Sequence, residues 1–150
     1  VTESVDIDVK APRREVLYNC EQLVLGQESF LGTVFRFGGL YGKGRKLGQF
    51  LSRSQRVIYA DECVNLVHLE DCVQIVVRYL GDCPDSSGIF NVVSDAHPLK
   101  GELYTRAALT LGVDPPKVSE GRLGFKRVDN FKIKSLLGYS FLYPDPLLLA

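Results

Sequence analysis

The feature that most constrains this chain is the run TVFRFGGLYGKGR at residues 33–45, where a β-favouring segment leads into a cluster of four glycines. Threonine, valine and phenylalanine suit the pleated, half-buried surface of a sheet, so residues 33–37 are predicted to form a strand. Glycine lets a backbone turn sharply and approach a ligand with no Cβ in the way. Because ligands of open α/β sheets bind beyond the carboxyl ends of strands, the run predicts either a binding edge or a plain strand-to-loop turn.

Length and composition predict one globular domain. The chain has 150 residues, of which 45% are hydrophobic and 24% charged, ordinary values for a folded domain with its own core. Eighteen basic and eighteen acidic side chains cancel, so no overall field favours nucleic acid. No apolar run approaches the ~20 residues of a spanning helix. We therefore expect neither nucleic acid nor a membrane as a partner.

Four motifs follow one another along the chain: RFGGLYGKGR at 36–45, NLVHLED at 65–71, FNVVSD at 90–95 and LLGY at 136–139. In order and spacing they resemble the NAD-dependent epimerase/dehydratase family of extended short-chain dehydrogenase/reductases. The first motif matches the family pattern at Arg36, Leu40, Tyr41, Gly42, Gly44 and Arg45. Gly39 and Lys43 stand where many family members have asparagine and proline.

The resemblance implies an α/β fold, the C-terminal part of a Rossmann-type fold plus a small mixed α/β substrate lobe. Residues 1–45 would supply the last helix and strand of the Rossmann-like domain, and residues 46–150 the small C-terminal substrate-binding lobe. The chain has no methionine and no Gly-x-Gly-x-x-Gly, the loop that seats a dinucleotide pyrophosphate. We expect the N-terminal nucleotide-binding half to lie outside this chain and to be its partner, in the same polypeptide or as a separate chain.

The resemblance also implies ligands. NAD or NADP would bind at Phe37, Gly38, Gly39 and Leu40, and a nucleotide-sugar-like metabolite at Tyr41, Arg45 and Arg56. The basic side chains of residues 43–56 are either a solvated face or a clamp for a diphosphate, because a guanidinium binds phosphate oxygens through a planar fork.

A helix is predicted at residues 12–25, between Pro12 and Gly26. Its apolar residues have the spacing of a buried stripe: Val16, Leu17, Cys20, Leu23 and Val24. In the resembled family this helix carries Tyr-x-x-x-Lys, in which the lysine lowers the pKa of the phenol and holds the nicotinamide ribose. Here Arg13 and Leu17 occupy those two positions. Tyr41 is the first candidate to take over the acid–base role of the missing tyrosine, but no catalytic residue is assigned. The helix often lies in a family dimer interface, so a homodimer is expected.

A buried helix, apolar nearly all round, is predicted to open at Glu70 and Asp71, to run to about Leu80 and to stop at Gly81. We expect Asp71 to cap this helix and His68 to hydrogen-bond to neighbouring backbone. The two residues could instead be two members of a hydrolase triad, but the sequence has no serine elbow to supply the third. A strand at 89–93, a helix ending at Gly112 and a short helix near 130–137 follow.

Cysteine spacing predicts no metal site. Cys63, His68, Cys72 and Cys83 could be drawn as a zinc set, but their spacings fit no common one. We expect reduced thiols, buried at Cys20 and Cys72, in an intracellular, cytoplasmic protein, with an organelle stroma or matrix also open.

Two functions are compatible with these features, and whether the protein is an enzyme stays open. One is a divergent NAD(P)-dependent epimerase/dehydratase-like protein that acts on or binds a nucleotide-sugar-like metabolite, with weak or no oxidoreductase activity. The alternative is a non-catalytic structural or interaction subunit of a larger assembly. The missing tyrosine and lysine favour the second, and the glycine-rich loop favours cofactor binding.

Overall fold

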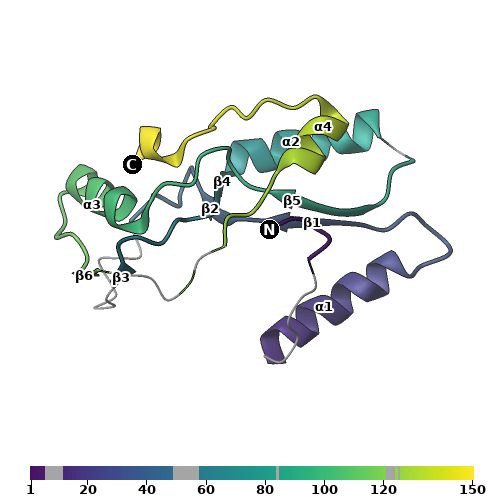
Figure 1. Ribbon diagram of the computed structural model, residues 1–150. Helices are drawn as coiled ribbons and strands as arrows, with labels where there is room; N and C mark the ends of the chain where they lie inside the picture. Colours follow the sequence, from purple (N-terminus) through teal and green to yellow (C-terminus); the bar gives the residue numbers. More distant parts are fainter. Residues whose placement is uncertain (6–11, 49–57, 84, 121–123, 125) are drawn as a thin grey trace.

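The computed structural model describes residues 1–5, 12–48, 58–83, 85–120, 124 and 126–150 and has a mixed α/β fold, as predicted (Figure 1). In chain order its elements are α1 (Pro12–Leu25), β1 (Thr33–Phe37), β2 (Gly39–Tyr41), β3 (Ile58–Tyr59), β4 (Leu66–His68), α2 (Leu69–Asp82), β5 (Gly88–Val92), α3 (Lys100–Leu111), β6 (Val118–Ser119), α4 (Phe131–Leu137) and η2 (Pro146–Leu149). Among the described residues, no helix has both the length and the apolar character needed to cross a membrane.

The described strands form three parallel pairs, β1–β5, β2–β4 and β3–β6. The predicted strand at residues 33–37 is confirmed, and it pairs in register with β5 from Thr33–Gly88 to Phe37–Val92. In the sequence, β1 lies before residue 45 and β5 lies after it, and yet the two strands pair. The division of the chain into two domains at residue 45 therefore stays a prediction.

The glycine cluster does not turn directly after residue 37, because Gly39–Tyr41 continues as β2 alongside β4. A Cβ on Gly38 would lie 2.8 Å from the carbonyl oxygen of Asn65, and one on Gly39 would lie 2.7 Å from Leu66 Cδ2. These two glycines therefore permit the close approach of β2 to β4. The turn comes later, at Gly42 and Gly44, whose φ angles are 133° and 78°.

Two clusters of buried side chains hold the elements together. One joins α2, β4, β5 and α4 around Ile75, Phe90 and Ile133, and the other joins β2, β4 and α3 around Tyr41 and Leu103. α3 ends at Gly112 and α4 at Gly138, both in the left-handed conformation that favours glycine. The predicted α3 and α4 are thereby confirmed.

α2 is buried on one face only. The expectation that this helix is apolar and buried nearly all round is therefore wrong. Asp71, Cys72, Ile75 and Tyr79 are buried, whereas Val77 and Leu80 are 60% and 70% exposed. The reason is that β4 and α4 cover one side of α2 (Figure 1), while its opposite face points away from the strands.

The apolar stripe predicted on α1 is not buried either. None of the 14 residues of α1 is buried, and Leu17 and Leu23 are 61% and 67% exposed. α1 packs against β1, on the side away from α2 and α4 (Figure 1). That contact covers part of Val24 and Leu25 and leaves the rest of the stripe open.

Candidate functional site

A cavity of about 350 Å³ opens at the carboxyl ends of β1 and β5, and we call it the strand-end cavity. It is lined by Val1, Thr2, Val5, Arg14, Arg36, Phe37, Gly38, Asn65, Asn91, Val93, Lys126 and Val128. Two predicted cofactor residues, Phe37 and Gly38, line this cavity. The other two, Gly39 and Leu40, belong to β2 and are not among its lining residues.

Asn65 builds one wall of the strand-end cavity. Its side-chain nitrogen donates to the carbonyl oxygen of Lys126 at 2.6 Å, and its side-chain oxygen accepts from the backbone nitrogen of Val128 at 2.8 Å. One amide thus holds a segment that lies more than sixty residues further along the chain. The backbone nitrogen of Asn91, on β5, donates to Glu3 Oε1 at 2.8 Å and fixes residues 1–5 against the same cavity.

The electrostatics of the strand-end cavity suit an anion. Arg14, Arg36 and Lys126 are among its lining residues, and guanidinium and ammonium groups bind phosphate oxygens. Arg36 is itself held by Glu21 of α1, with Nε–Oε1 and Nη2–Oε2 distances of 2.8 and 2.6 Å. These hydrogen bonds raise the pKa of Arg36 above its ordinary value, although burial opposes them.

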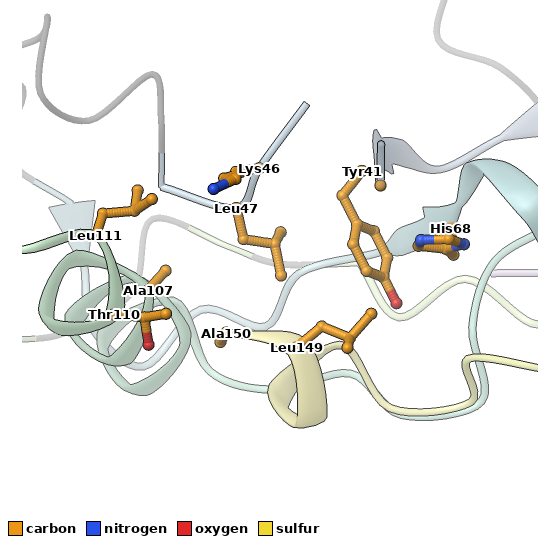
Figure 2. Close-up of a pocket in the computed structure, with 10 residues that line it drawn as sticks. Tyr41, Lys46, Leu47, His68, Ala107, Thr110, Leu111, Leu149 and Ala150 are labelled. Atoms are coloured by element: carbon orange, nitrogen blue, oxygen red, sulfur yellow. The ribbon is translucent and has the colours of Figure 1, made fainter. Parts of the chain in front are cut away.

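A second cavity, of about 280 Å³, lies between the β2 turn, α3 and the last residues, and we call it the Tyr41–His68 cavity (Figure 2). Tyr41 is 3% exposed, and its hydroxyl is buried without a hydrogen-bond partner among the described residues. Burial raises the pKa of Tyr41 to about 12. Tyr41 is therefore a neutral phenol near pH 7 and a poor acid–base group there.

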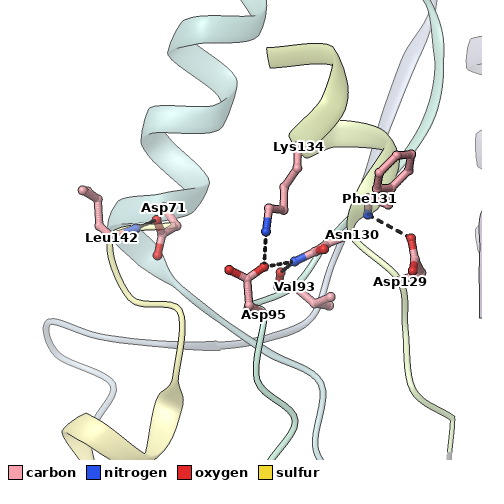
Figure 3. Close-up of polar contacts among 8 residues, drawn as sticks. All are labelled: Asp71, Val93, Asp95, Asp129, Asn130, Phe131, Lys134 and Leu142. Atoms are coloured by element: carbon pink, nitrogen blue, oxygen red, sulfur yellow. Dashed lines mark hydrogen bonds and ion pairs between the residues drawn. The ribbon is translucent and has the colours of Figure 1, made fainter. Parts of the chain in front are cut away.

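His68 has its expected role and Asp71 does not. His68 Nδ1 accepts from the backbone nitrogen of Glu70 at 3.2 Å, at the start of α2. Asp71 is fully buried and binds the C-terminal tail instead of capping the helix. It accepts from Tyr139 Oη at 2.8 Å, and from the backbone nitrogens of Leu142 at 2.7 Å (Figure 3) and Tyr143 at 3.1 Å. Because the tail supplies three donors to this carboxylate, Asp71 joins distant segments.

Asp95 ties the end of β5 to α4 (Figure 3). Its Oδ1 accepts from Asn130 Nδ2 at 2.8 Å and from Lys134 Nζ at 2.7 Å, and Asn130 also donates to the carbonyl oxygen of Val93 at 2.9 Å. This network fixes the residues that follow β5, next to the strand-end cavity.

The other predicted residues are dispersed. Arg13 and Leu17 are exposed on α1. Arg45 is exposed at the turn, where its backbone exchanges hydrogen bonds with Gly42. Arg56 lies outside the described residues, and so do Phe50, Leu51 and Arg53.

The cysteines are free, and they are less buried than expected. Cys72 is buried, but Cys20 is exposed on the open face of α1, so that expectation is wrong for Cys20. In the described part of the chain, no three histidine, cysteine, aspartate or glutamate side chains are grouped to hold a metal ion.

Sequence reasoning assigned no site role to Asn65, Asn91 or Lys126. The available signal was a polar residue inside or beside an apolar strand, as in IFNVV at 89–93 and VNLV at 64–67. Such a residue must find a partner when it is buried, so it marks a position where the chain contacts something polar.

The fold defines the class of protein. Solved structures that match 99% of this chain include a functionally unknown conserved protein from Silicibacter pomeroyi (TM-score 0.82, 25% identity). They also include MoeE5 in complex with UDP-glucose and NAD (TM-score 0.75, 19% identity) and the human epimerase family protein SDR39U1 with NADPH (TM-score 0.77, 16% identity). The chain covers 57% of each of these three structures. It has the fold of the NAD-dependent epimerase/dehydratase proteins, and the resemblance predicted from its motifs is confirmed.

Among curated proteins, the chain is 33% identical over 120 residues to Protein YeeZ of Escherichia coli K12. The match takes in 77% of this chain and 42% of YeeZ, so the chain spans less than half of that relative's length. No family model matches the chain.

Proposed function

We propose that the complete protein binds NAD or NADP at the strand-end cavity and also binds a nucleotide-sugar-like metabolite. The observation that carries this proposal is the position of the cavity, at the carboxyl ends of two parallel strands, where open α/β sheets bind ligands. Its cations suit the phosphates of such a cofactor or sugar nucleotide. Structural neighbours solved with NAD, NADPH and UDP-glucose support the same ligand class.

We further propose that hydride-transfer activity is weak or absent. A guanidinium has no acceptor atom and is a poor proton-transfer group, so Arg13 does not replace a catalytic tyrosine, and Leu17 has no group that could hold a ribose hydroxyl. Tyr41, with a pKa of about 12 and a buried hydroxyl, does not replace them. Losing general acid–base help costs roughly 10²–10⁴ in rate.

The four free cysteines agree with an intracellular, cytoplasmic location.

The test is calorimetric titration of NAD(H) and NADP(H) into the complete protein, followed by assays with UDP-sugar substrates. Lys126→Ala removes a cation from the cavity and should weaken cofactor binding about tenfold, the effect of one charge-assisted hydrogen bond. Lys43→Ala is the matched control, because Lys43 is exposed and lines neither cavity. Absence of any cofactor binding would refute the first proposal, and brisk turnover would refute the second.

The second candidate function is a non-catalytic subunit that associates through α1. The observation that favours it is the exposed apolar stripe, with Val16, Leu17 and Leu23 each more than 60% exposed. A surface of this kind marks an interaction site, and its partner would be a second copy or the N-terminal half of the protein. A Leu17→Asp/Leu23→Asp variant should then dissociate a dimer in sedimentation, and an unchanged profile would exclude α1 from its interface.

A further inference from the structure

We propose that Asn65 is a positioning residue of the strand-end cavity, and that it keeps the cavity in its binding shape by holding residues 126–130 at the cavity wall. We call residues 126–130 the strap. For the identity of the ligand this inference rests on the proposed function, whereas the hold of Asn65 on the strap can be measured without any ligand.

The side chain of Asn65 contacts the strap as a peptide group of a neighbouring strand would. Its Nδ2 donates to the carbonyl oxygen of Lys126, and its Oδ1 accepts from the backbone nitrogen of Val128. That carbonyl and that N–H lie on either side of Arg127. Among side chains of this length, only a carboxamide carries separate donor and acceptor atoms on one planar group. Replacing Asn65 by any residue of similar size therefore removes at least one of the two bonds.

The main chain of Asn65 contacts the opposite side of the cavity. Its carbonyl oxygen accepts from the backbone nitrogen of Gly39 at 2.8 Å, and a Cβ on Gly38 would lie 2.8 Å from the same oxygen. The backbone nitrogen of Gly38 in turn donates to the carbonyl oxygen of Val92 at 2.9 Å, at the end of β5. Asn65 thus lies between the end of the β1–β5 pair and the strap, and it sets the separation of these two parts of the wall.

The far end of the strap is held independently of Asn65. Asn130 Nδ2 donates to the carbonyl oxygen of Val93 at 2.9 Å and to Asp95 Oδ1 at 2.8 Å (Figure 3), and the strap leads from there into α4 (Figure 1). Removing the Asn65 side chain should therefore loosen residues 126–128 and leave the start of α4 in place.

Two further contacts reach the strap from Val1. Its amino nitrogen donates to the carbonyl oxygen of Arg127, and its carbonyl oxygen accepts from the backbone nitrogen of Asp129 at 2.9 Å. Neither contact involves Val128, whose N–H is bonded to Asn65. The amide of Val128 therefore reports on the bond to Asn65.

The position of the strap matters for binding because it supplies part of the cavity lining. Lys126 and Val128 line the cavity together with Gly38 and Asn65 itself. A wall that is already in place favours binding, because a loose segment loses conformational entropy when a ligand orders it. Loss of the Asn65 amide should therefore weaken binding about tenfold, the effect of one lost hydrogen bond.

The first measurement is hydrogen exchange in the ligand-free complete protein. It compares Asn65→Ala with Asn19→Ala, the same substitution at an exposed position of α1 that lines neither cavity. Asn65→Ala should speed exchange of the Val128 amide about tenfold. It should leave the amide of Phe131, which is bonded to Asp129 Oδ1 at 2.9 Å, unchanged. Asn19→Ala should change neither amide, and a general loss of stability would instead speed exchange at both.

The second measurement is the affinity of the complete protein for NADH and NADPH, by calorimetry. Asn65→Ala should weaken binding about tenfold, and Asn19→Ala should leave it unchanged. Bound cofactor should also slow exchange of the Val128 amide in the unaltered protein. Asn65→Asp is a second variant, which keeps the volume of the side chain in case Asn65→Ala does not fold. It keeps an acceptor for Val128 and loses the donor to Lys126, so binding should weaken while the Val128 amide stays protected.

The outcomes separate this inference from the proposed function. If Asn65→Ala does not speed exchange at Val128, Asn65 does not hold the strap and the inference is wrong. If exchange rises and cofactor affinity is unchanged, the strap does not shape the binding site, so the inference is wrong and the proposed function stands. If neither NADH nor NADPH binds the unaltered protein, both are wrong.

Discussion

α1 and α2 are both 14-residue helices, and they lie on opposite sides of the β1–β5 pair (Figure 1). α2 buries four residues, one of them the charged Asp71, whereas α1 buries none. The two sequences are both rich in apolar residues, so composition does not separate them. The difference lies in what each helix contacts: α2 packs against β4 and α4, and α1 packs against β1.

The bonds that fix the two helices also differ. α2 is fixed through a buried carboxylate that gathers three donors from the tail. α1 is joined to β1 through the Glu21–Arg36 pair, whose side chains are 15% and 23% exposed. Apolar burial stabilises in proportion to the area removed from water. We therefore expect equivalent substitutions in the two helices to have very different effects on the free energy of unfolding.

The largest difference should come from removing an apolar side chain. Ile75→Ala, at a fully buried position of α2, should lower the free energy of unfolding by about 3–4 kcal/mol, through lost burial and a cavity. Leu23→Ala, at an exposed position of α1, should change it by less than about 0.5 kcal/mol. Urea unfolding of the complete protein measures both. A Leu23→Ala effect as large as that of Ile75→Ala would show that α1 is covered in the complete protein.

The first-turn acids of the two helices give the next comparison. Asp71→Ala leaves Tyr139 Oη and two backbone N–H groups without their acceptor, and it should cost about 3 kcal/mol. Glu15→Ala, in the first turn of α1, removes an exposed carboxylate and should cost under about 1 kcal/mol, its interaction with the helix dipole. Asp71→Asn keeps one acceptor oxygen and should fall between them. Thermal unfolding distinguishes the three, and equal melting temperatures for Asp71→Ala and Glu15→Ala would contradict the role of Asp71.

A smaller effect is expected at the link between α1 and β1. Glu21→Gln removes the charge from a bidentate, partly buried pair and should cost about 1–2 kcal/mol, because charge-assisted hydrogen bonds are the stronger ones. Glu28→Gln, at an exposed position just beyond α1, is the control and should have no measurable effect. If hydrogen exchange in α1 is unchanged by Glu21→Gln, the pair does not anchor the helix.

Local features of the fold could be predicted from the sequence. The strand at 33–37 follows from its β-branched and aromatic residues, and α3 and α4 follow from glycines that adopt the left-handed conformation at their ends. Each of these signals acts within a few residues. Burial does not, because it depends on elements that are distant in sequence, and the apolar patterns of α1 and α2 did not indicate which faces would be covered.

The candidate site was predictable in part for the same reason. Phe37 and Gly38 could be found because they end a strand, and strand ends face the ligand edge. Asn65 could not, since its role is to hold Lys126 and Val128 from another part of the chain. Asp71 was predicted to cap its own helix because that is the local use of an acid there, and the structure uses it for a segment 68 or more residues away.

The last difference between the two helices concerns the chemical reactivity of one cysteine on each helix. Cys20 is exposed on α1, whereas Cys72 is 7% exposed on α2. Burial, aided by the charge of Asp71, raises the pKa of Cys72 from 9.0 to about 11. At pH 8 only about one Cys72 thiol in a thousand is the reactive thiolate. Native protein treated with iodoacetamide should therefore label Cys20 at least about 100-fold faster than Cys72, as measured by peptide mass spectrometry.

The same raised pKa gives a pH dependence with a definite sign. The unfolded Cys72 thiol ionises near 9.0 and the folded one near 11, so the unfolded state loses its proton first. This thiol therefore favours the folded state below pH 9, and that contribution is lost as the pH rises toward 11. Cys72→Ala should remove this part of the alkaline destabilisation, and Cys20→Ser should remove only the fast labelling phase.

Rapid labelling of Cys72 at pH 8 would show that α2 opens readily, and slow labelling of Cys20 would show that α1 is covered. Either result would remove the contrast between the two helices.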